Sequence, residues 1–490
     1  MESTILIVFV LYSLVILLIS HITSRKSNNS TFFTGNKKSP WFVVAYGMIG
    51  ASLSGVTFMS VPGGVYSGQF TYFGIVLGYI IGYAVIAFLL LPLYYKLNLT
   101  SIYSFLEIRF GKASEKTGAF LFIVSRLIGS AIRMYLVVFV LYEFVFKNWG
   151  IPFYIPALFF ILFILIYTFK GGIKTVVWTD TLQTTFLLLA AILTVLYILN
   201  YLDISFCQLM KISTENGYTK LFETDWTNSK FFVKQILSGA FITIAMTGLD
   251  QDMMQKNMTC KTLKDAQKNV LTSSFIFVIV NLLFMCLGAS LIYYAQETNF
   301  ILPTNEDGVV INDKIFPSIA FSINTITSVI FMLGLIAAGY SSADGTLTAL
   351  TTTFCFDFLH FDNNNELSEN QKTKYRKIIH IAFALLYVLI IIIFRPFHNE
   401  SLIDKIFEIA GYTYGPLLGL FSFGLFIKNR VPNDKFVPYI AIISPIISYL
   451  LNRYSKDLFF GYQFGFEILI VNGLLTFISL LLISKKITKQ

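Results

Sequence analysis

Thirteen stretches of mostly apolar residues follow one another along almost the whole chain. A membrane-spanning helix needs about 20 such residues, and the stretches lie near residues 3–22, 41–66, 71–95, 117–146, 151–169, 175–200, 230–250, 269–297, 316–356, 376–395, 403–427, 435–452 and 466–484. Apolar residues make up 56% of the 490 residues and charged residues only 13%, against roughly 45–50% and 25% in soluble chains. These proportions exclude a soluble enzyme or a nucleic-acid-binding protein. We predict an all-α polytopic membrane protein with about 13 transmembrane helices in a lipid bilayer.

The Lys and Arg residues between these stretches predict the orientation of the chain. With the N-terminus outside, the cytoplasmic segments hold 24 of them, Lys256 included, and the outside segments hold nine. Cytoplasmic loops keep the basic excess, which also accounts for the net charge of +9. The first stretch has Glu2 in place of a basic start, so we expect a retained helix and not a signal peptide. We expect a plasma membrane protein, in the inner membrane if bacterial, with a cytoplasmic C-terminus.

The cysteines and histidines do not predict a disulfide or a metal centre. The four cysteines form no CxxC pair, and the four histidines stand alone, without the ligand spacing of a metal site. The phosphate-binding pattern GxxxxGKS/T is absent, although a Gly-Gly pair stands at 171–172. We therefore expect no transition metal, no organic cofactor and no catalytic residue, which argues against a membrane-embedded enzyme.

Six ionisable residues lie inside the apolar stretches, where a charge is costly and marks a candidate functional residue. They are Arg126, Arg133, Glu143, Asp180, Asp344 and Glu408. Arg126 and Glu143 lie near the ends of their stretch, where they can reach the membrane interface or pair with another charge. Arg133, Asp180 and Asp344 lie deeper, and no cationic partner for the two aspartates is evident in the sequence.

The second stretch contains a run of Gly, Ser and Thr from Gly50 to Gly64, with Pro62 near its end. A continuous helix is poor here, and backbone carbonyls freed at membrane depth persist only where they line a cavity or an ion site. Close helix packing through small residues is the alternative. We expect an interruption between Ser52 and Pro62.

The ninth stretch carries Ser341, Ser342, Asp344 and Gly345 deep in apolar sequence. Hydroxyl and carbonyl oxygens are hard ligands that suit a small hard cation and not a soft metal. Serine hydroxyls in ordinary helices also bond to the carbonyl of the preceding turn. The buried aspartate beside the two serines favours a cation site over that alternative.

Five segments together resemble the sodium:solute symporter family, which includes sialic acid, proline, sugar and iodide transporters. They are the interrupted run from Ser52 to Pro62, GGIKTVVWTDTLQ at 171–183, GLDQDMMQ at 248–255, AGYSS at 338–342 and YGPLLG at 414–419. The resemblance implies a LeuT-like fold of two inverted five-helix repeats, each opening with a broken helix. The second break would lie between Thr243 and Asp250. We expect an extra helix and basic loop at 1–40, repeats at 41–200 and 230–427, an external loop at 201–229 and further helices with a basic tail at 428–490.

The resemblance also implies where cations bind. The main sodium site would use Gly50, Leu53, Ala338, Ser341 and Ser342. Some relatives bind a second sodium, which here would use Asp180, Ser341, Asp344 and Gly345. This chain departs from those relatives because it has Asp344 and Gly345 where they carry hydroxyl residues. The two carboxylates would either strengthen a second cation site or share a proton, so we expect one sodium ion or two.

The expected function is sodium-coupled import of a small organic solute, such as a sugar, a polyol or a carboxylate like sialic acid, by alternating access. The solute would contact Ser52, Ser54, Thr57, Arg133, Thr243, Met246 and Glu408, with Arg133 as the ligand for an anionic group because its planar fork matches a carboxylate. A proton-coupled transporter that uses Asp180 and Asp344 is the alternative. We expect the chain to function as a monomer.

Overall fold

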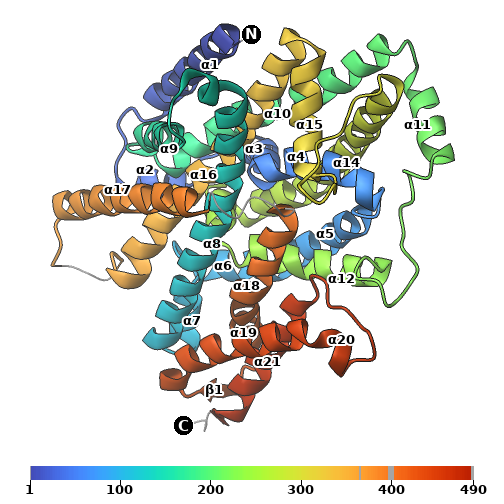
Figure 1. Ribbon diagram of the computed structural model, residues 1–490. Coiled ribbons are helices and arrows are strands. Elements are labelled where there is room, and N and C mark those ends of the chain that lie inside the picture. Colours follow the sequence, from blue (N-terminus) through green and yellow to red (C-terminus); the bar gives the residue numbers. More distant parts are fainter. Residues whose placement is uncertain (1, 363–365, 395–401, 487–490) are drawn as a thin grey trace.

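The structure, a computed structural model, describes residues 2–362, 366–394 and 402–486 (Figure 1). Nine of its helices are long and apolar enough to cross a membrane, two more spans are bent helix pairs, and α9 and α21 are shorter apolar helices. Each predicted stretch corresponds to one of these elements, which confirms the all-helical membrane architecture. The basic tail beyond residue 486 lies outside the described residues.

The elements of the first half begin with α1 (Glu2–Thr23), α2 (Asn29–Thr34) and a short 3-10 turn (Gly35–Lys37). The spans that follow are α3 (Trp41–Ser52) with α4 (Gly55–Gly68), α5 (Phe73–Val85) continued through a π-helical turn (Ile86–Leu90) into α6 (Leu91–Lys96), α8 (Lys112–Leu141), α9 (Tyr154–Thr168) and α10 (Ile173–Tyr201). The short α7 (Ser104–Arg109) precedes α8, and α11 (Phe206–Glu215) lies in the long loop after α10.

The second half contains α12 (Phe232–Thr243), a π-helical turn (Ile244–Gly248), α13 (Gln251–Met258), α14 (Leu263–Glu297), α15 (Asn312–Ile323), α16 (Thr325–Thr353), α17 (Glu369–Ile393) and α18 (Leu402–Phe426). The last elements are α19 (Val437–Arg453), α20 (Ser455–Leu458) and α21 (Ile468–Leu482). The strands β1 (Arg430–Pro432) and β2 (Ser484–Lys486) pair antiparallel, with Arg430 opposite Lys486. This pair fastens the end of α21 to the start of the α18–α19 connection.

Two spans are broken, as the sequence predicts. Helices α3 and α4 meet at an angle of 59°, and α12 with its π-helical turn meets α13 at 67°. The first break falls at Leu53, whose φ of −86° and ψ of 86° leave the helical region, and the Ser54 side chain caps α4. Pro62 lies inside α4 and does not end it, so the break occupies only the Ser52 end of the predicted interval. Packing by neighbouring helices lets a membrane helix keep a proline.

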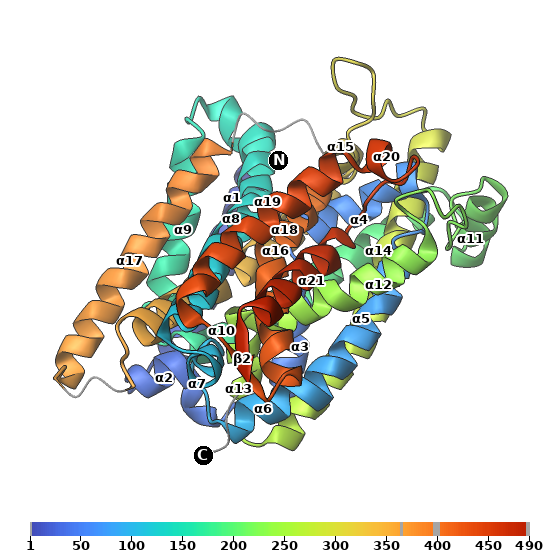
Figure 2. The same ribbon diagram turned by 90° about the horizontal axis from the view of Figure 1, so that it is seen from below.

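Helix α16 forms the centre of the molecule. Every residue from Gly334 to Thr353 is buried, because α3, α8 and α10 pack around this helix. Figures 1 and 2 show α5 beside α12 on one flank and α9 beside α17 on another. The break in α3–α4 therefore faces the serine-rich part of α16 in the interior of the protein.

Candidate functional site

Backbone oxygens at the first break meet the two serines of α16. The Ser341 hydroxyl donates to the Gly50 carbonyl at 2.9 Å and lies 3.3 Å from the Ala338 carbonyl. The Ser342 hydroxyl donates to the Gly339 carbonyl at 3.1 Å. Both serine side chains are shielded from solvent. The structure thus brings Ser341 and the neighbouring Ala338 carbonyl to Gly50 beside the break, where Leu53 ends α3. The hydrogen bonds of Ser342 join it to α16 itself and to Ser130 of α8.

Thr184 on α10 holds the broken helix in place, and the sequence analysis missed this residue. Its hydroxyl accepts a hydrogen bond from the Gly50 N–H at 3.1 Å and donates to the Asp180 carbonyl at 2.7 Å. A Cβ atom at Gly50 would lie 3.2 Å from the Thr184 Cα and closer still to its hydroxyl. Glycine is therefore required at position 50 for α3 to approach α10.

The sequence analysis found no cationic partner for Asp180, but the structure shows that Lys256 is one. The Lys256 ammonium lies 3.0 Å from the Asp180 carboxylate and 3.3 Å from that of Asp252. Lys256 is only 1% exposed, although its position in the sequence placed it among the cytoplasmic loop charges. The only local signal was its spacing of four residues from Asp252, which puts the two side chains on one face of α13.

Arg126 belongs to the same buried charge cluster. Its guanidinium forms an ion pair with Asp252, lies 3.7 Å from Asp250 and donates to the Thr346 hydroxyl at 3.1 Å. The Tyr414 hydroxyl donates to Asp250 at 2.6 Å. Of the two possibilities that its position allowed, reaching the membrane interface or pairing with another charge, Arg126 shows the second. Glu143 pairs with the half-exposed Lys147 at 2.5 Å.

Asp344 has a different set of partners, all of them uncharged. Its carboxylate accepts hydrogen bonds from the Tyr167 hydroxyl at 2.8 Å, the Thr179 hydroxyl at 3.3 Å and the Gly345 N–H at 2.6 Å. Hydrogen bonds to a carboxylate favour its charged form. Asp180 therefore lies in contact with an ammonium, whereas the direct hydrogen-bond partners of Asp344 are three uncharged donors.

A cavity of about 90 Å³ lies beside the two helix breaks. Six of the seven residues predicted to contact the solute line it: Ser52, Ser54, Thr57, Arg133, Thr243 and Met246. Tyr79, Tyr83 and Phe277 add aromatic walls that the sequence analysis did not single out. Among the side chains that the structure describes, which do not include those of residues 401–405, no carboxylate lies within ion-pairing distance of Arg133. The cavity thus has hydroxyl groups, aromatic rings and an available guanidinium.

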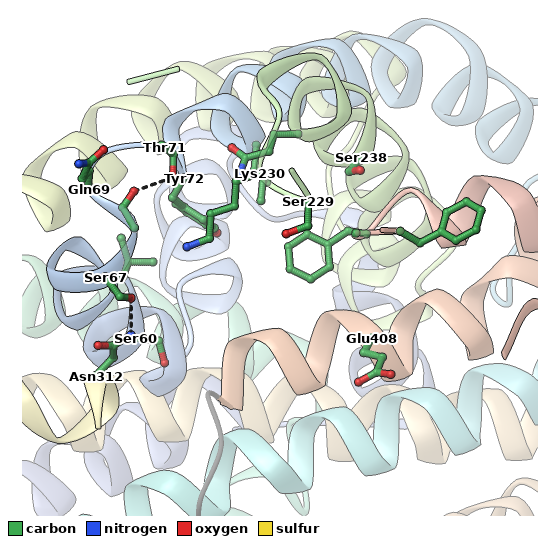
Figure 3. A pocket seen from close by; sticks show the side chains of 18 of the residues that line it. Ser60, Ser67, Gln69, Thr71, Tyr72, Ser229, Lys230, Ser238, Asn312 and Glu408 are labelled. Carbon is green, nitrogen blue, oxygen red and sulfur yellow. Dashed lines mark hydrogen bonds between the residues drawn. The ribbon is translucent and has the colours of Figure 1, made fainter. Parts of the chain in front are cut away.

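The seventh predicted residue, Glu408, is not brought into this cavity. It lines a separate cavity of about 350 Å³, across from Ser60 and Ser67 (Figure 3). That cavity also touches Ser229 and Lys230, which belong to the connection before α12, and Asn312, the first residue of α15. Tyr72 lines both cavities and therefore stands between them.

Comparisons with known proteins agree with this arrangement. Residues 32–434 match the model of the sodium:solute symporter family. The sodium/sialic acid symporter SiaT of Proteus mirabilis is 26% identical over 93% of this chain and 91% of its own. The sodium/sialic acid symporter NanT of Aliivibrio fischeri is 25% identical over 93% and 89%.

A solved structure of a Na⁺-coupled sialic acid symporter in a substrate-bound outward-open state is also similar. It has a TM-score of 0.84 and 24% identity, with 99% of each chain covered. This likeness confirms the LeuT-like fold that the family resemblance implied.

Proposed function

The chain belongs to the sodium:solute symporter family, and we propose that the solute it imports carries a carboxylate group, as sialic acids do. It is a multi-pass membrane transporter that couples sodium to a small organic solute, and it is not an enzyme. The proposal concerns the chemistry of the solute and the residues that hold it.

Arg133 is the observation that carries this proposal. Both arginines of α8 line the small cavity. Arg126 is neutralised by Asp252 and Asp250, whereas Arg133 has no acidic partner among the described side chains, which leave out those of residues 401–405. A guanidinium held in such a place favours a planar anion, which it binds through two parallel hydrogen bonds. The hydroxyls of Ser52, Ser54 and Thr57 suit the hydroxyl groups of a sugar acid. Relatives that are sodium/sialic acid symporters support this choice.

Sodium is proposed to bind at Gly50, Leu53, Ala338, Ser341 and Ser342. The Ser341 hydroxyl, which now donates to the Gly50 carbonyl, would turn its lone pair to the ion when sodium arrives. Carbonyls at a helix C-terminus carry partial negative charge and favour a cation. The break between α3 and α4 would contribute to both the sodium site and the solute cavity. When one ligand fixes the conformation of this break, the binding of the other ligand would become more favourable. Such reciprocal coupling is the thermodynamic requirement of symport.

Entry of the solute requires the small cavity to widen. Its volume of about 90 Å³ is below the roughly 300–1,000 Å³ typical of ligand pockets. Movement of Tyr72 would join it to the larger cavity, which we assign to the external vestibule. We further propose that repeats 41–200 and 230–427 move against each other during transport. In a bacterial inner membrane, the N-terminus would lie outside and the C-terminus in the cytoplasm. One chain would suffice for transport.

Uptake into proteoliposomes tests the proposal. We expect N-acetylneuraminate to accumulate with an inward sodium gradient and not with choline in its place, at either of two pH values. A methyl ester of the same sugar, which lacks the anionic carboxylate, should be a poor substrate. Equal uptake of the acid and its ester, or rapid uptake of neutral sugars alone, would contradict the role of Arg133.

A further inference from the structure

We propose that the paired strands β1 and β2 bind the phosphate headgroup of an anionic phospholipid at the membrane face that holds them. We name the five cationic residues of this region the basic ribbon: Lys428, Arg430, Lys435, Lys485 and Lys486. None of the five lines either cavity described above. The site is therefore independent of the proposed solute and sodium sites.

The register of the two strands places like charges opposite each other. Arg430 stands directly across the antiparallel pair from Lys486, so both side chains leave the same face of the ribbon, with Cβ atoms about 4.5–5.5 Å apart. Like charges at directly opposite positions destabilise a strand pair, and a two-stranded pair is only marginally stable by itself. An anion bound between these two side chains would replace their repulsion with two attractive contacts.

The Arg430 guanidinium is fixed in place but incompletely hydrogen-bonded. Its Nη2 donates to the Ser484 carbonyl of β2 at 3.0 Å, and its buried Nε has no hydrogen-bond partner among the described residues. Lys485 and Lys486 are exposed beside it. The ribbon thus combines one guanidinium in a defined position with two ammonium groups that are free to turn toward a ligand.

Asp434, the only acidic residue in the segments 428–436 and 484–486, is engaged elsewhere. Its carboxylate accepts hydrogen bonds from the N–H groups of Ala113 at 2.9 Å and Ser114 at 2.8 Å, at the start of α8. Among the side chains that the structure describes, no carboxylate lies within ion-pairing distance of the basic ribbon. The charges of the ribbon therefore require a counter-ion from outside the chain.

Exposed apolar side chains border the basic ribbon. Phe426, the last residue of α18, is 65% exposed, and Leu482, the last residue of α21, is 80% exposed. Phe436 and Tyr439, which follow β1, are exposed as well. Figure 2 shows β2 toward the end of the molecule that holds α2 and α7, away from α11 and α20. The ribbon therefore begins where apolar, lipid-facing helices end, which is the level of the lipid headgroups.

An anionic phospholipid matches both parts of this surface. Its phosphate can accept charge-assisted hydrogen bonds from Arg430 and Lys486, while its acyl chains lie along Phe426 and Leu482. Clusters of Lys and Arg next to the end of a membrane helix attract such lipids. The general excess of basic residues in cytoplasmic loops would account for the presence of these lysines, but not for a like-charged pair held across two strands. A zwitterionic lipid would bring a cation of its own, which the ribbon repels.

Thermal unfolding of the delipidated full-length protein, in neutral detergent and a choline buffer, tests the proposal. We expect dioleoylphosphatidylglycerol to raise the unfolding temperature of the wild type, whereas dioleoylphosphatidylcholine or inorganic phosphate at the same concentration should not. Lys485→Gln/Lys486→Gln should raise half-saturating phosphatidylglycerol about 25-fold, since each charge contributes roughly fivefold. Lys261→Gln/Lys264→Gln, which removes two exposed charges before α14, is the matched control and should bind like the wild type. Equal stabilisation by phosphatidylcholine or by phosphate, or an equal loss in the control variant, would overturn the proposal.

Lys486→Glu tests the like-charged pair separately. Without lipid, this variant should unfold at a higher temperature than the wild type, because a carboxylate would then stand opposite Arg430. It should also lose most of the stabilisation by phosphatidylglycerol. A lower unfolding temperature without lipid, or undiminished stabilisation by the lipid, would contradict the proposal. These measurements contain neither solute nor sodium, so their failure would leave the proposed transport function untouched.

Discussion

Replacing Ser341 by alanine tests the proposed main sodium site most directly. In the structure the Ser341 hydroxyl donates to the Gly50 carbonyl at 2.9 Å, a bond whose net contribution to stability is about 0.5–1.5 kcal/mol. In the sodium-bound protein the same oxygen would be an ion ligand, which we compare with a charged hydrogen bond of about 1.5–3 kcal/mol. The alanine variant loses both interactions, so the binding free energy falls by their difference, about 1–2 kcal/mol. Since 1.4 kcal/mol is a factor of ten, half-saturating sodium should rise by roughly 5- to 30-fold.

Sodium-dependent uptake at saturating solute measures this shift, and thermal unfolding without sodium measures the folding cost separately. Ser290→Ala is the matched control, because Ser290 is also fully buried and donates to a carbonyl in its own helix, that of Leu287 at 2.7 Å. It should lose similar stability but keep wild-type sodium dependence. Ser342→Ala should raise half-saturating sodium as Ser341→Ala does. If both variants respond to sodium like the wild type, the site does not lie at this break.

Three further changes test neighbouring parts of the structure. Arg133→Lys should raise the KM for a carboxylate solute by about tenfold or more, since an ammonium cannot form the two parallel bonds, and unchanged KM in uptake assays would exclude the bidentate role. Asp180→Asn should destabilise the protein by about 3–5 kcal/mol because it leaves Lys256 with less compensation; adding Lys256→Met should recover part of the thermal stability, and a strictly additive loss would argue against the pair. Gly50→Ala should cost about 1–3 kcal/mol through overpacking against Thr184, and wild-type unfolding temperature in this variant would show that the helices can separate freely.

The helices and the first break could be predicted from the sequence because their causes are local. Transfer of about 20 consecutive apolar residues into lipid is favourable whatever surrounds them, and the run of small and hydroxyl residues after Gly50 is a poor helix in any fold. The same reasoning identified Arg133 and the aspartates, since a charge at membrane depth requires a function or a partner. The family resemblance placed Ser341 and Ser342 with the break, and the structure joins Gly50 to Ser341.

The partners of these charges were decided only by the tertiary structure. Lys256 appeared as a loop charge because its stretch of sequence is polar, but the bend before α13 turns it inward against Asp180. The sequence analysis assigned Glu408 and Arg133 to the same solute site, but Glu408 lies on the wall of the other cavity. Helices within lipid gain little from apolar contact with each other, so their arrangement depends on close packing and polar pairs between distant segments. Those pairs depend on the angle and rotation of each helix, which the local composition of the sequence does not determine.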